Sequence, residues 1–534
     1  MDTQKSWKRS LRRPAVWLVV LIVVQSIIYL CAGIGKSYIH MDEAYSLALT
    51  HVENFEITEN SDFYNTWHTP AYFQQYLAVQ EDELGDFSPV YENQKNDVHP
   101  PLFYFFLRLA QSFVVGKFSK WPGIILNILI HIGITVLLYA IWRQLLAKEK
   151  SAKLKTFVLT SIIAITVASV SSAVYIRMYA LLTLMVLLTL WLHLRLISAK
   201  TWRPTLMIGI GVTVLLGVLT QYYYLFFLVP LYVVMAVLFL RAKEWKRLGI
   251  YTGILAAAGF ISLLVWPYSL QHMFFSYRGQ GVIHNFMNLP VLLQNIWGYI
   301  KVVNYDIFHQ IGLVVIILLI VVLWYIVKLR KTAPQKNPVL PLILWPTLVY
   351  FLIVSATSPF IELRYIMPVC GLIFGLMMFF VYQLLRCLVT EKTRNLIMLS
   401  LIGVTWIAAP VQLLLGQMRI ELLYRDRQAV MQETTTHSDA PLLYLISSKN
   451  NRFLDNILPF TLAEHSYLAL DFDYEDTKAL QKILAGQDLS HGLMLWISDQ
   501  HDHPATLAAV QEALGLREVE YIQTINTCSV YYLY

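Results

Sequence analysis

The chain has 534 residues, of which 57% are hydrophobic and 14% are charged, and its formal net charge is +7. A mean hydropathy of +0.54 exceeds what a water-soluble core of this length needs, so a lipid bilayer must surround much of the chain. The positive charge does not indicate nucleic-acid binding, because Lys and Arg stand in short tracts at the ends of apolar runs. The four cysteines predict no disulfide framework, because three lie in or beside apolar runs.

About eleven apolar runs are long enough to cross roughly 30 Å of hydrocarbon as helices. The first follows a basic N-terminus and lacks a clear cleavage site, so we expect a retained span rather than a signal peptide. The predicted spans lie near residues 15–34, 122–142, 157–174, 178–197, 205–220, 222–240, 249–268, 311–328, 339–356, 366–385 and 395–415.

A shorter apolar run at 101–116 decides the orientation. If this run crosses the membrane, the basic tract at 143–155 faces outward. If it lies flat or re-enters, that tract and four later basic tracts all face the cytoplasm, and we adopt this second arrangement. It predicts a cytoplasmic segment at 1–14, a membrane module at 15–416 with outer loops at 35–121 and 269–310, and an extracytoplasmic region at 417–534.

The first outer loop is strongly acidic. From Lys36 to His99 it holds 12 acidic residues and 2 lysines, which gives a local charge of −10. It opens with His40-Met41-Asp42-Glu43-Ala44-Tyr45 and closes with Asp97-Val98-His99-Pro100-Pro101-Leu102. Most of its other carboxylates are expected to be solvated surface groups.

The C-terminal region alternates short apolar runs with helix-like patterns. The runs are 442–446, 467–470 and 493–497, the helical patterns are 449–463, 475–485 and 504–514, and two extended runs follow at 519–525 and 528–534. This alternation predicts a small α/β domain with a mostly parallel sheet. It contains no glycine-rich phosphate loop and no catalytic signature.

Polar residues at the predicted outer ends of the spans are the candidate functional groups. An arginine between two apolar runs is costly unless it is partnered, so Arg177 indicates function by default. The full set is Asp42, Glu43, Asp97, His99, Arg177, Tyr179, Gln221, Tyr222, Arg278, His284, Arg364 and Tyr365.

Several of these residues have a simpler interpretation. Arg364 alone is typical of an arginine that extends from a span end to water. Gln221 with the following tyrosines is equally consistent with an aromatic belt. His40, Asp42, Asp97 and His99 also have the chemistry of a divalent-metal site, although their spacing matches no known ligand signature.

The joint pattern of carboxylates and cations facing one compartment predicts group transfer. Nucleotide-activated donors are absent outside the cytoplasm, so an enzyme there must take its donor from the membrane, and a lipid phosphate is the natural carrier. A departing lipid phosphate needs an Arg or Lys clamp, and an acceptor hydroxyl needs a carboxylate base. The candidate set supplies both.

Several motifs resemble glycosyltransferase family 39, which includes the protein O-mannosyltransferases and the aminoarabinose transferase of lipid A. The most specific are Asp42-Glu43-Ala44-Tyr45 after a first span and Asp97-Val98-His99-Pro100-Pro101-Leu102-Phe103. Arg177-Met178-Tyr179, Thr220-Gln221-Tyr222-Tyr223 and Arg364-Tyr365-Ile366-Met367-Pro368 resemble further elements of that family, with Gln221 in place of a histidine. The likeness covers roughly residues 15–415.

The resemblance implies a GT-C fold and inverting transfer from a polyprenyl-phosphate sugar. It assigns Asp42 as the general base or acceptor-orienting carboxylate and Glu43 as its neighbour in the site. Arg177, Arg278 or Arg364 would neutralise the departing phosphate, and His99 would shape the pocket floor through a helix that Pro100 and Pro101 begin. The C-terminal region does not match the protein mannosyltransferases, so the acceptor stays open between a glycan, a lipid and a protein.

The sequence therefore predicts a multi-pass glycosyltransferase acting at the outer face of a bacterial plasma membrane. Its partners would be a polyprenyl-phosphate sugar, an extracytoplasmic acceptor and membrane lipids, with no nucleic acid and no cofactor assigned. A flippase of lipid-linked sugars is the first alternative, but such a protein would place ionisable residues near mid-membrane and often has repeated halves. A non-catalytic scaffold or sensor is the second, and it would leave Asp42 and Arg177 unexplained.

Overall fold

The computed structural model describes ten stretches of the chain, and the chain forms two compact units. One unit is Gly33–Asn93 with Tyr104–Gly123 and Glu421–Tyr534, here called the sheet unit, and the remainder is called the helical unit. The described residues are 14–53, 55, 63–199, 203–276, 288–304, 337–415, 425–450, 453–473, 476–525 and 527–534.

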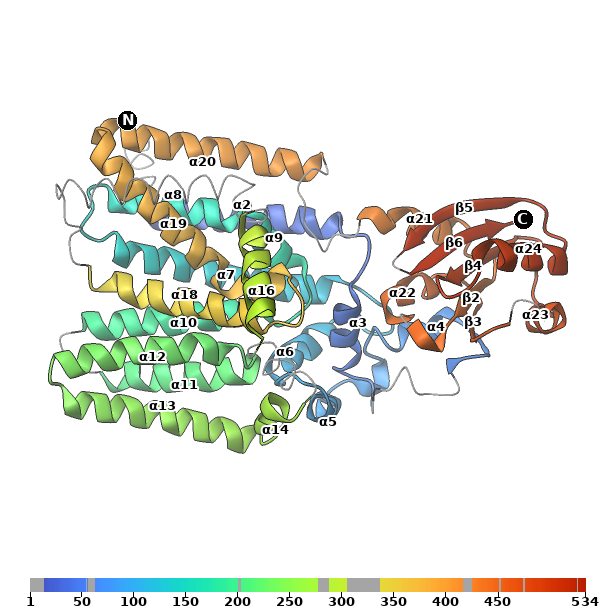
Figure 1. The fold of residues 1–534 in the computed structure, drawn as a ribbon, viewed down its shortest axis with the longest axis horizontal. Helices are drawn as coiled ribbons and strands as arrows, with labels where there is room; N and C mark the ends of the chain where they lie inside the picture. Colours follow the sequence, from blue (N-terminus) through green and yellow to red (C-terminus); the bar gives the residue numbers. More distant parts are fainter. Residues whose placement is uncertain are drawn as a thin grey trace, which may run out of the picture. The chain divides into compact units, whose positions relative to one another are not determined.

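The helical unit is built mainly from long apolar helices (Figure 1). Helix α10 lies at its centre and packs against α11, α12, α18 and α19. The described elements are α2 (Pro14–Ile34), α7 (Trp121–Leu145), α8 (Ala152–Ala164), α9 (Val167–Val174), α10 (Tyr179–Ser198), α11 (Pro204–Thr220), α12 (Tyr224–Arg241), α13 (Trp245–Val265), α14 (Ser269–Phe274), α16 (Leu289–Val302), α18 (Val339–Thr357), η4 (Leu363–Tyr365), α19 (Met367–Leu388) and α20 (Glu391–Leu414).

The chain is a multi-pass membrane protein. Within the described stretches, α2, α7, α10, α12, α13 and α18 are long and apolar enough to cross a bilayer, and the bent pair α8–α9 adds a seventh candidate. The predicted runs at 205–220 and 366–385 lie in α11 and α19. The predicted run at 395–415 lies in α20, and the run at 311–328 lies outside the described residues.

The predicted continuous span at 157–174 is instead broken, with α8 and α9 meeting at an angle of 55°. Hydroxyl groups account for the break, because they provide the local backbone with partners other than the helix ladder. Thr166 caps α9 by accepting from the Ser169 N–H, and the Ser169 hydroxyl donates to the Ile163 carbonyl at 2.7 Å.

The apolar run at 101–116 forms the ten-residue helix α6 (Leu102–Gln111). At 1.5 Å per residue this helix is about 15 Å long, which is too short to cross the hydrocarbon. Its Arg108 is fully buried, and the guanidinium donates to the backbone carbonyls of Glu83 and Asp86. Two of its three guanidinium nitrogens are therefore paired with backbone carbonyls of the protein.

The sheet unit contains a six-stranded sheet in the order β1-β3-β2-β4-β6-β5. Its elements, with helix α5 at its border, are α3 (Met41–Ala48), β1 (Trp67–His68), α4 (Pro70–Gln74), η2 (Glu81–Glu83), α5 (Ser88–Asn96), η5 (Arg425–Arg427), α21 (Gln428–Thr436), β2 (Leu442–Ile446), η6 (Ser448–Asn450), α22 (Phe453–Phe460), β3 (Ser466–Leu470), α23 (Thr477–Leu484), β4 (Leu493–Ser498), α24 (His503–Leu514), β5 (Val519–Ile525) and β6 (Cys528–Leu533).

The prediction of a C-terminal α/β domain is confirmed, but the prediction that its sheet is mostly parallel was wrong. Strand β2 runs parallel to β3 and β4, whereas the β4–β6, β5–β6 and β1–β3 pairs are antiparallel. The short connection between β5 and β6 permits only a hairpin, which makes that pair antiparallel. Leu443, Leu445, Leu495 and Ile497 are fully buried in its core.

Strand β1 comes from the acidic loop and was not predicted. Trp67 pairs with Tyr467 of β3, and its indole N–H donates to the Ile483 carbonyl at 2.9 Å. Phe63 packs edge-on against Phe453 with ring centroids 4.5 Å apart. Strands of one sheet must lie in one compartment, so the first loop and the C-terminal region share a side of the membrane.

Candidate functional site

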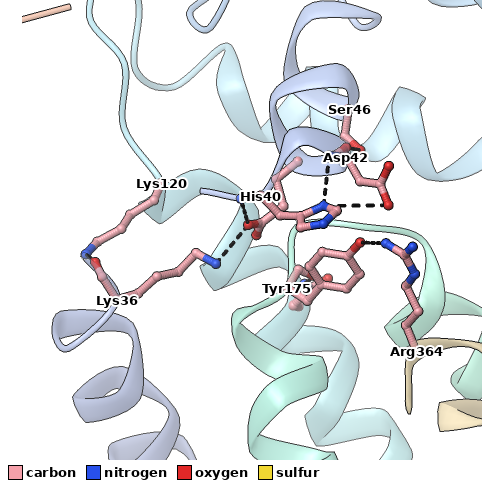
Figure 2. Close-up of polar contacts among 9 residues, drawn as sticks. Lys36, His40, Asp42, Ser46, Lys120, Tyr175 and Arg364 are labelled. Carbon is pink, nitrogen blue, oxygen red and sulfur yellow. Dashed lines mark hydrogen bonds and ion pairs between the residues drawn. The ribbon is translucent and has the colours of Figure 1, made fainter. Parts of the chain in front are cut away.

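The N-terminus of α3 presents Asp42 in the sheet unit. His40 caps this helix, because its Nδ1 accepts from the Asp42 N–H at 3.0 Å while the His40 N–H donates to Glu43 Oε2 at 2.8 Å. His40 and Glu43 thus form a reciprocal capping box. The Asp42 carboxylate lies 3.7 Å from the same ring nitrogen and keeps 24% of its side chain exposed (Figure 2). Asp42 is therefore held in place and remains accessible.

Glu43 is held differently from Asp42. It forms a 2.8 Å ion pair with the Lys36 ammonium, and both side chains are 0% exposed. Burial lowers the pKa of Lys36, and the neighbouring Glu43 carboxylate opposes this shift. The Lys120 ammonium donates to the Lys36 carbonyl (Figure 2). In this geometry Glu43 fixes the start of α3, and its predicted catalytic role stays a prediction.

In the helical unit, Arg177 lies in the extended link between α9 and α10 and is buried, with 6% exposure. Its N–H donates to the Tyr175 carbonyl at 2.8 Å. The rings of Tyr175 and Tyr179 stack with centroids 6.0 Å apart and planes at 7°. The link thus carries a buried arginine next to the end of a candidate span, and two aligned tyrosine rings flank it in the sequence.

Arg364 joins these rings from η4. Its Nη1 donates to the Tyr175 hydroxyl at 2.8 Å (Figure 2), and its Nε lies 2.6 Å from the Glu362 carboxylate. The guanidinium also lies 5.1 Å from the centroid of the Tyr365 ring, which contacts the Tyr179 ring edge-on. Such cation–π contacts favour a desolvated arginine over one extended into water.

Asp97 and His99 form the third part of this unit's polar set. The His99 Nδ1 donates to Asp97 Oδ2 at 2.8 Å, and both side chains are half-buried. Burial raises the pKa of Asp97, but the charge and hydrogen bond of His99 and the charge of Arg177 together hold it below its usual value. Asp97 is therefore an anion near the Arg177 charge.

Tyr222 lies in a hydrogen-bonded chain that the sequence did not indicate. The Trp266 indole N–H donates to the Tyr222 hydroxyl at 3.2 Å, which donates to His272 Nδ1 at 3.0 Å. His272 Nε2 in turn donates to the Lys95 carbonyl at 3.0 Å, because a carbonyl can only accept. Burial lowers the pKa of His272, and burial raises the pKa of Tyr222 to about 12.

Sequence reasoning missed His272, Trp266 and Tyr175. Trp266 follows α13 and fell inside the span predicted at 249–268, whereas His272 lies in α14 within the predicted outer loop, and no spacing signal marks either residue. Tyr175 stands two positions before Arg177, as Tyr179 stands two positions after it, and this symmetric placement could have singled it out.

The predicted residues fall into two sets. Asp42 and Glu43 lie in the sheet unit, whereas Asp97, His99, Arg177, Arg364 and their tyrosines lie in the helical unit. Gln221 is buried and its side-chain oxygen accepts from the next backbone N–H at 2.7 Å, so it stabilises its own turn. Arg278 and His284 lie outside the described residues. Over those described stretches, no three His, Cys, Asp or Glu side chains are arranged to hold a metal ion.

No family model matches the chain, and no curated protein sequence matches it significantly. Among solved structures, it is similar to ArnT from Cupriavidus metallidurans bound to undecaprenyl phosphate, with 13% identity, coverage of 97% of this chain and 98% of that chain, and a TM-score of 0.48. It is also similar to an Archaeoglobus fulgidus oligosaccharyltransferase in complex with Zn and sulfate, with 12% identity, coverage of 93% and 70%, and a TM-score of 0.47. Both neighbours are GT-C glycosyltransferases, the class that the motifs resemble. Because each TM-score lies below 0.5, the function of this chain has to be inferred from its own residues.

Proposed function

We propose that this chain is an inverting glycosyltransferase that moves a sugar from a polyprenyl-phosphate donor to an extracytoplasmic acceptor. The observation that carries the proposal is a pair of buried arginines, Arg177 and Arg364, in a membrane protein. The Arg364 guanidinium lies over the Tyr365 ring and donates to the Tyr175 hydroxyl. Buried cations at a span end favour an anionic ligand, and the ring faces suit a sugar. The described carboxylate partner of Arg364, Glu362, is 41% exposed and could be exchanged for a phosphate.

Asp42 supplies the second part of the chemistry. In the proposed step its carboxylate removes the proton from the acceptor hydroxyl as that oxygen attacks the anomeric carbon. The bond between the anomeric carbon and the phosphate oxygen breaks, and its electron pair leaves with the lipid phosphate. Arg177 and Arg364 would stabilise that negative charge. Attack from the face opposite the phosphate inverts the anomeric centre.

The test is sugar transfer by Asp42→Asn and Asp42→Ala in membrane vesicles supplied with radiolabelled polyprenyl-phosphate sugars. We expect transfer to fall at least 100-fold, with normal membrane insertion, because a general base contributes about 10²–10⁴ to the rate. Asp82→Asn is the matched control, since Asp82 is an exposed carboxylate of the same loop. Normal transfer by both Asp42 variants would reject the base assignment.

The same vesicles distinguish the two alternatives. A flippase would move the labelled lipid to the other leaflet without passing the sugar to any acceptor. A scaffold would do neither, and the wild-type chain would then be as inactive in sugar transfer as the two Asp42 variants.

A further inference from the structure

The sheet unit contains an open cavity of about 370 Å³ that has no part in the proposed chemistry. Its walls come from the segment before α3, the segment before α7 and the helices α21 and α22. Three lysines line it, namely Lys36, Lys117 and Lys120. This volume lies within the range of small-ligand sites.

The charge inside the cavity is unbalanced. No Asp or Glu contributes to its lining. Lys36 is neutralised by Glu43, but within the described part of the chain neither Lys117 nor Lys120 has a carboxylate at ion-pair distance. Lys120 donates to the Lys36 carbonyl, and its ammonium lies 5.7 Å from the centroid of the Trp121 ring. The lining therefore contains the Lys120 ammonium without a carboxylate partner and a second, exposed lysine, Lys117, although residues 36–99 carry a charge of −10.

Burial lowers the pKa of Lys120, and the charge of Lys36 lowers it further. Both causes disfavour the ammonium form in the empty cavity. A bound anion would reverse them, because an opposite charge within about 4–6 Å favours the protonated lysine. The electrostatics of the cavity are thus more favourable with an anion present than without one.

The rest of the lining selects the kind of anion. Ser37 and Ser119 add hydroxyl donors, whereas Trp121, Leu458 and Leu462 add an apolar wall. Trp121 is also the first residue of α7, a candidate membrane span, so the cavity lies at the end of a span. Tryptophan at such a position is typical of the lipid headgroup level.

We propose that this cavity binds the phosphate group of a membrane lipid, with Lys117 and Lys120 pairing with the phosphate oxygens and the apolar wall receiving the adjoining chain. Phosphate has three or four oxygens that can accept from two ammonium groups and two hydroxyls at once. Binding would order the segment 36–39, which continues directly into the cap of α3. The proposal does not require sugar transfer, so it can fail or hold independently of the proposed function.

The test is photolabelling of the purified full-length chain with phosphatidic acid that carries a diazirine in its acyl chain. We expect labelled peptides that contain residues 117–121 or 458–462, located by mass spectrometry. Lys117→Glu with Lys120→Gln should lower labelling of those peptides at least fivefold. Lys482→Glu, an exposed lysine of the same unit, is the matched control and should label as the wild type does.

Two further arms make the result decisive. Because Lys120 donates to the Lys36 carbonyl, its loss could disturb folding, so Lys117→Glu alone is the second variant and should still lower labelling. If millimolar inorganic phosphate competes with labelling, the cavity recognises a phosphate group from any source. If inorganic phosphate does not compete, the cavity recognises the phosphate only as part of a lipid. Equal labelling by a diazirine diacylglycerol, or unchanged labelling of both lysine variants, would overturn the proposal.

Discussion

Removing the charge of Glu43 should strongly destabilise helix α3 against local opening. The Lys36–Glu43 pair is 2.8 Å long and fully buried. Glu43→Gln keeps an oxygen that can accept from the His40 N–H, so the change isolates the charge. Loss of one partner of a buried ion pair costs about 3–5 kcal/mol, because the other charge stays buried without compensation.

Hydrogen–deuterium exchange of the α3 amides measures this loss directly. Exchange through local opening becomes tenfold faster for each 1.4 kcal/mol, so about 3 kcal/mol corresponds to a rate increase of roughly 100-fold. The double variant Lys36→Met with Glu43→Gln should recover most of the protection, because no unpaired charge remains. Glu81→Gln, an exposed carboxylate of η2, serves as the control.

Two results would refute this reasoning. The first is an exchange rate in Glu43→Gln within about fivefold of the wild type, which would mean that the pair contributes little. The second is a double variant as labile as the sum of its two single changes, which would mean that the groups do not act as a pair.

Three further outcomes are expected. Tyr175→Phe removes the hydroxyl that accepts from Arg364, and a lost hydrogen bond to a charged group, worth about 1.5–3 kcal/mol, should lower sugar transfer roughly 10- to 100-fold in initial-rate assays; an unchanged rate would contradict this. Burial lowers the pKa of His272, so the stability that depends on its neutral form is present above the ordinary value of 6.5 and is lost as pH falls through the lower folded-state pKa. His272→Gln should therefore flatten the fall in Tm between pH 7.5 and pH 5. A parallel fall of Tm in the variant and the wild type would argue against the assignment. Gly217→Ala would place a Cβ 2.5 Å from a tyrosine ring and should destabilise the chain by about 1–3 kcal/mol in thermal unfolding, whereas Gly253→Ala, with nothing within 4 Å, should not.

The sequence predicted the parts of the fold that depend on local pattern. Apolar length identified the runs that became α2, α7, α10, α12, α13 and α18, because hydrocarbon thickness fixes that length. The strands β2, β5 and β6 begin and end within a residue of their predicted runs, because short apolar segments between turns have few alternatives. The break between α8 and α9 was missed, since it depends on hydroxyl groups that are also tolerated inside helices.

The candidate site was predictable only in part. Arg177 and Arg364 could be singled out because a charge among apolar residues is costly wherever it lies. The contact of Arg364 with Tyr175 could not, because it joins positions 189 apart in the chain. In the sequence, Glu43 belongs to a motif that predicts a catalytic acid. Only its buried ion pair with Lys36 in the structure shows that it holds the start of α3.

The position of β1 has a consequence for biosynthesis. Trp67 and its acceptor Ile483 are 416 positions apart. At about 5–20 residues per second, the ribosome needs roughly 20–80 s to make the intervening chain. During that interval the loop segment waits without its sheet while the membrane helices are inserted. A nascent chain halted before β3 is complete should therefore be a good substrate for chaperones and proteases on that side of the membrane.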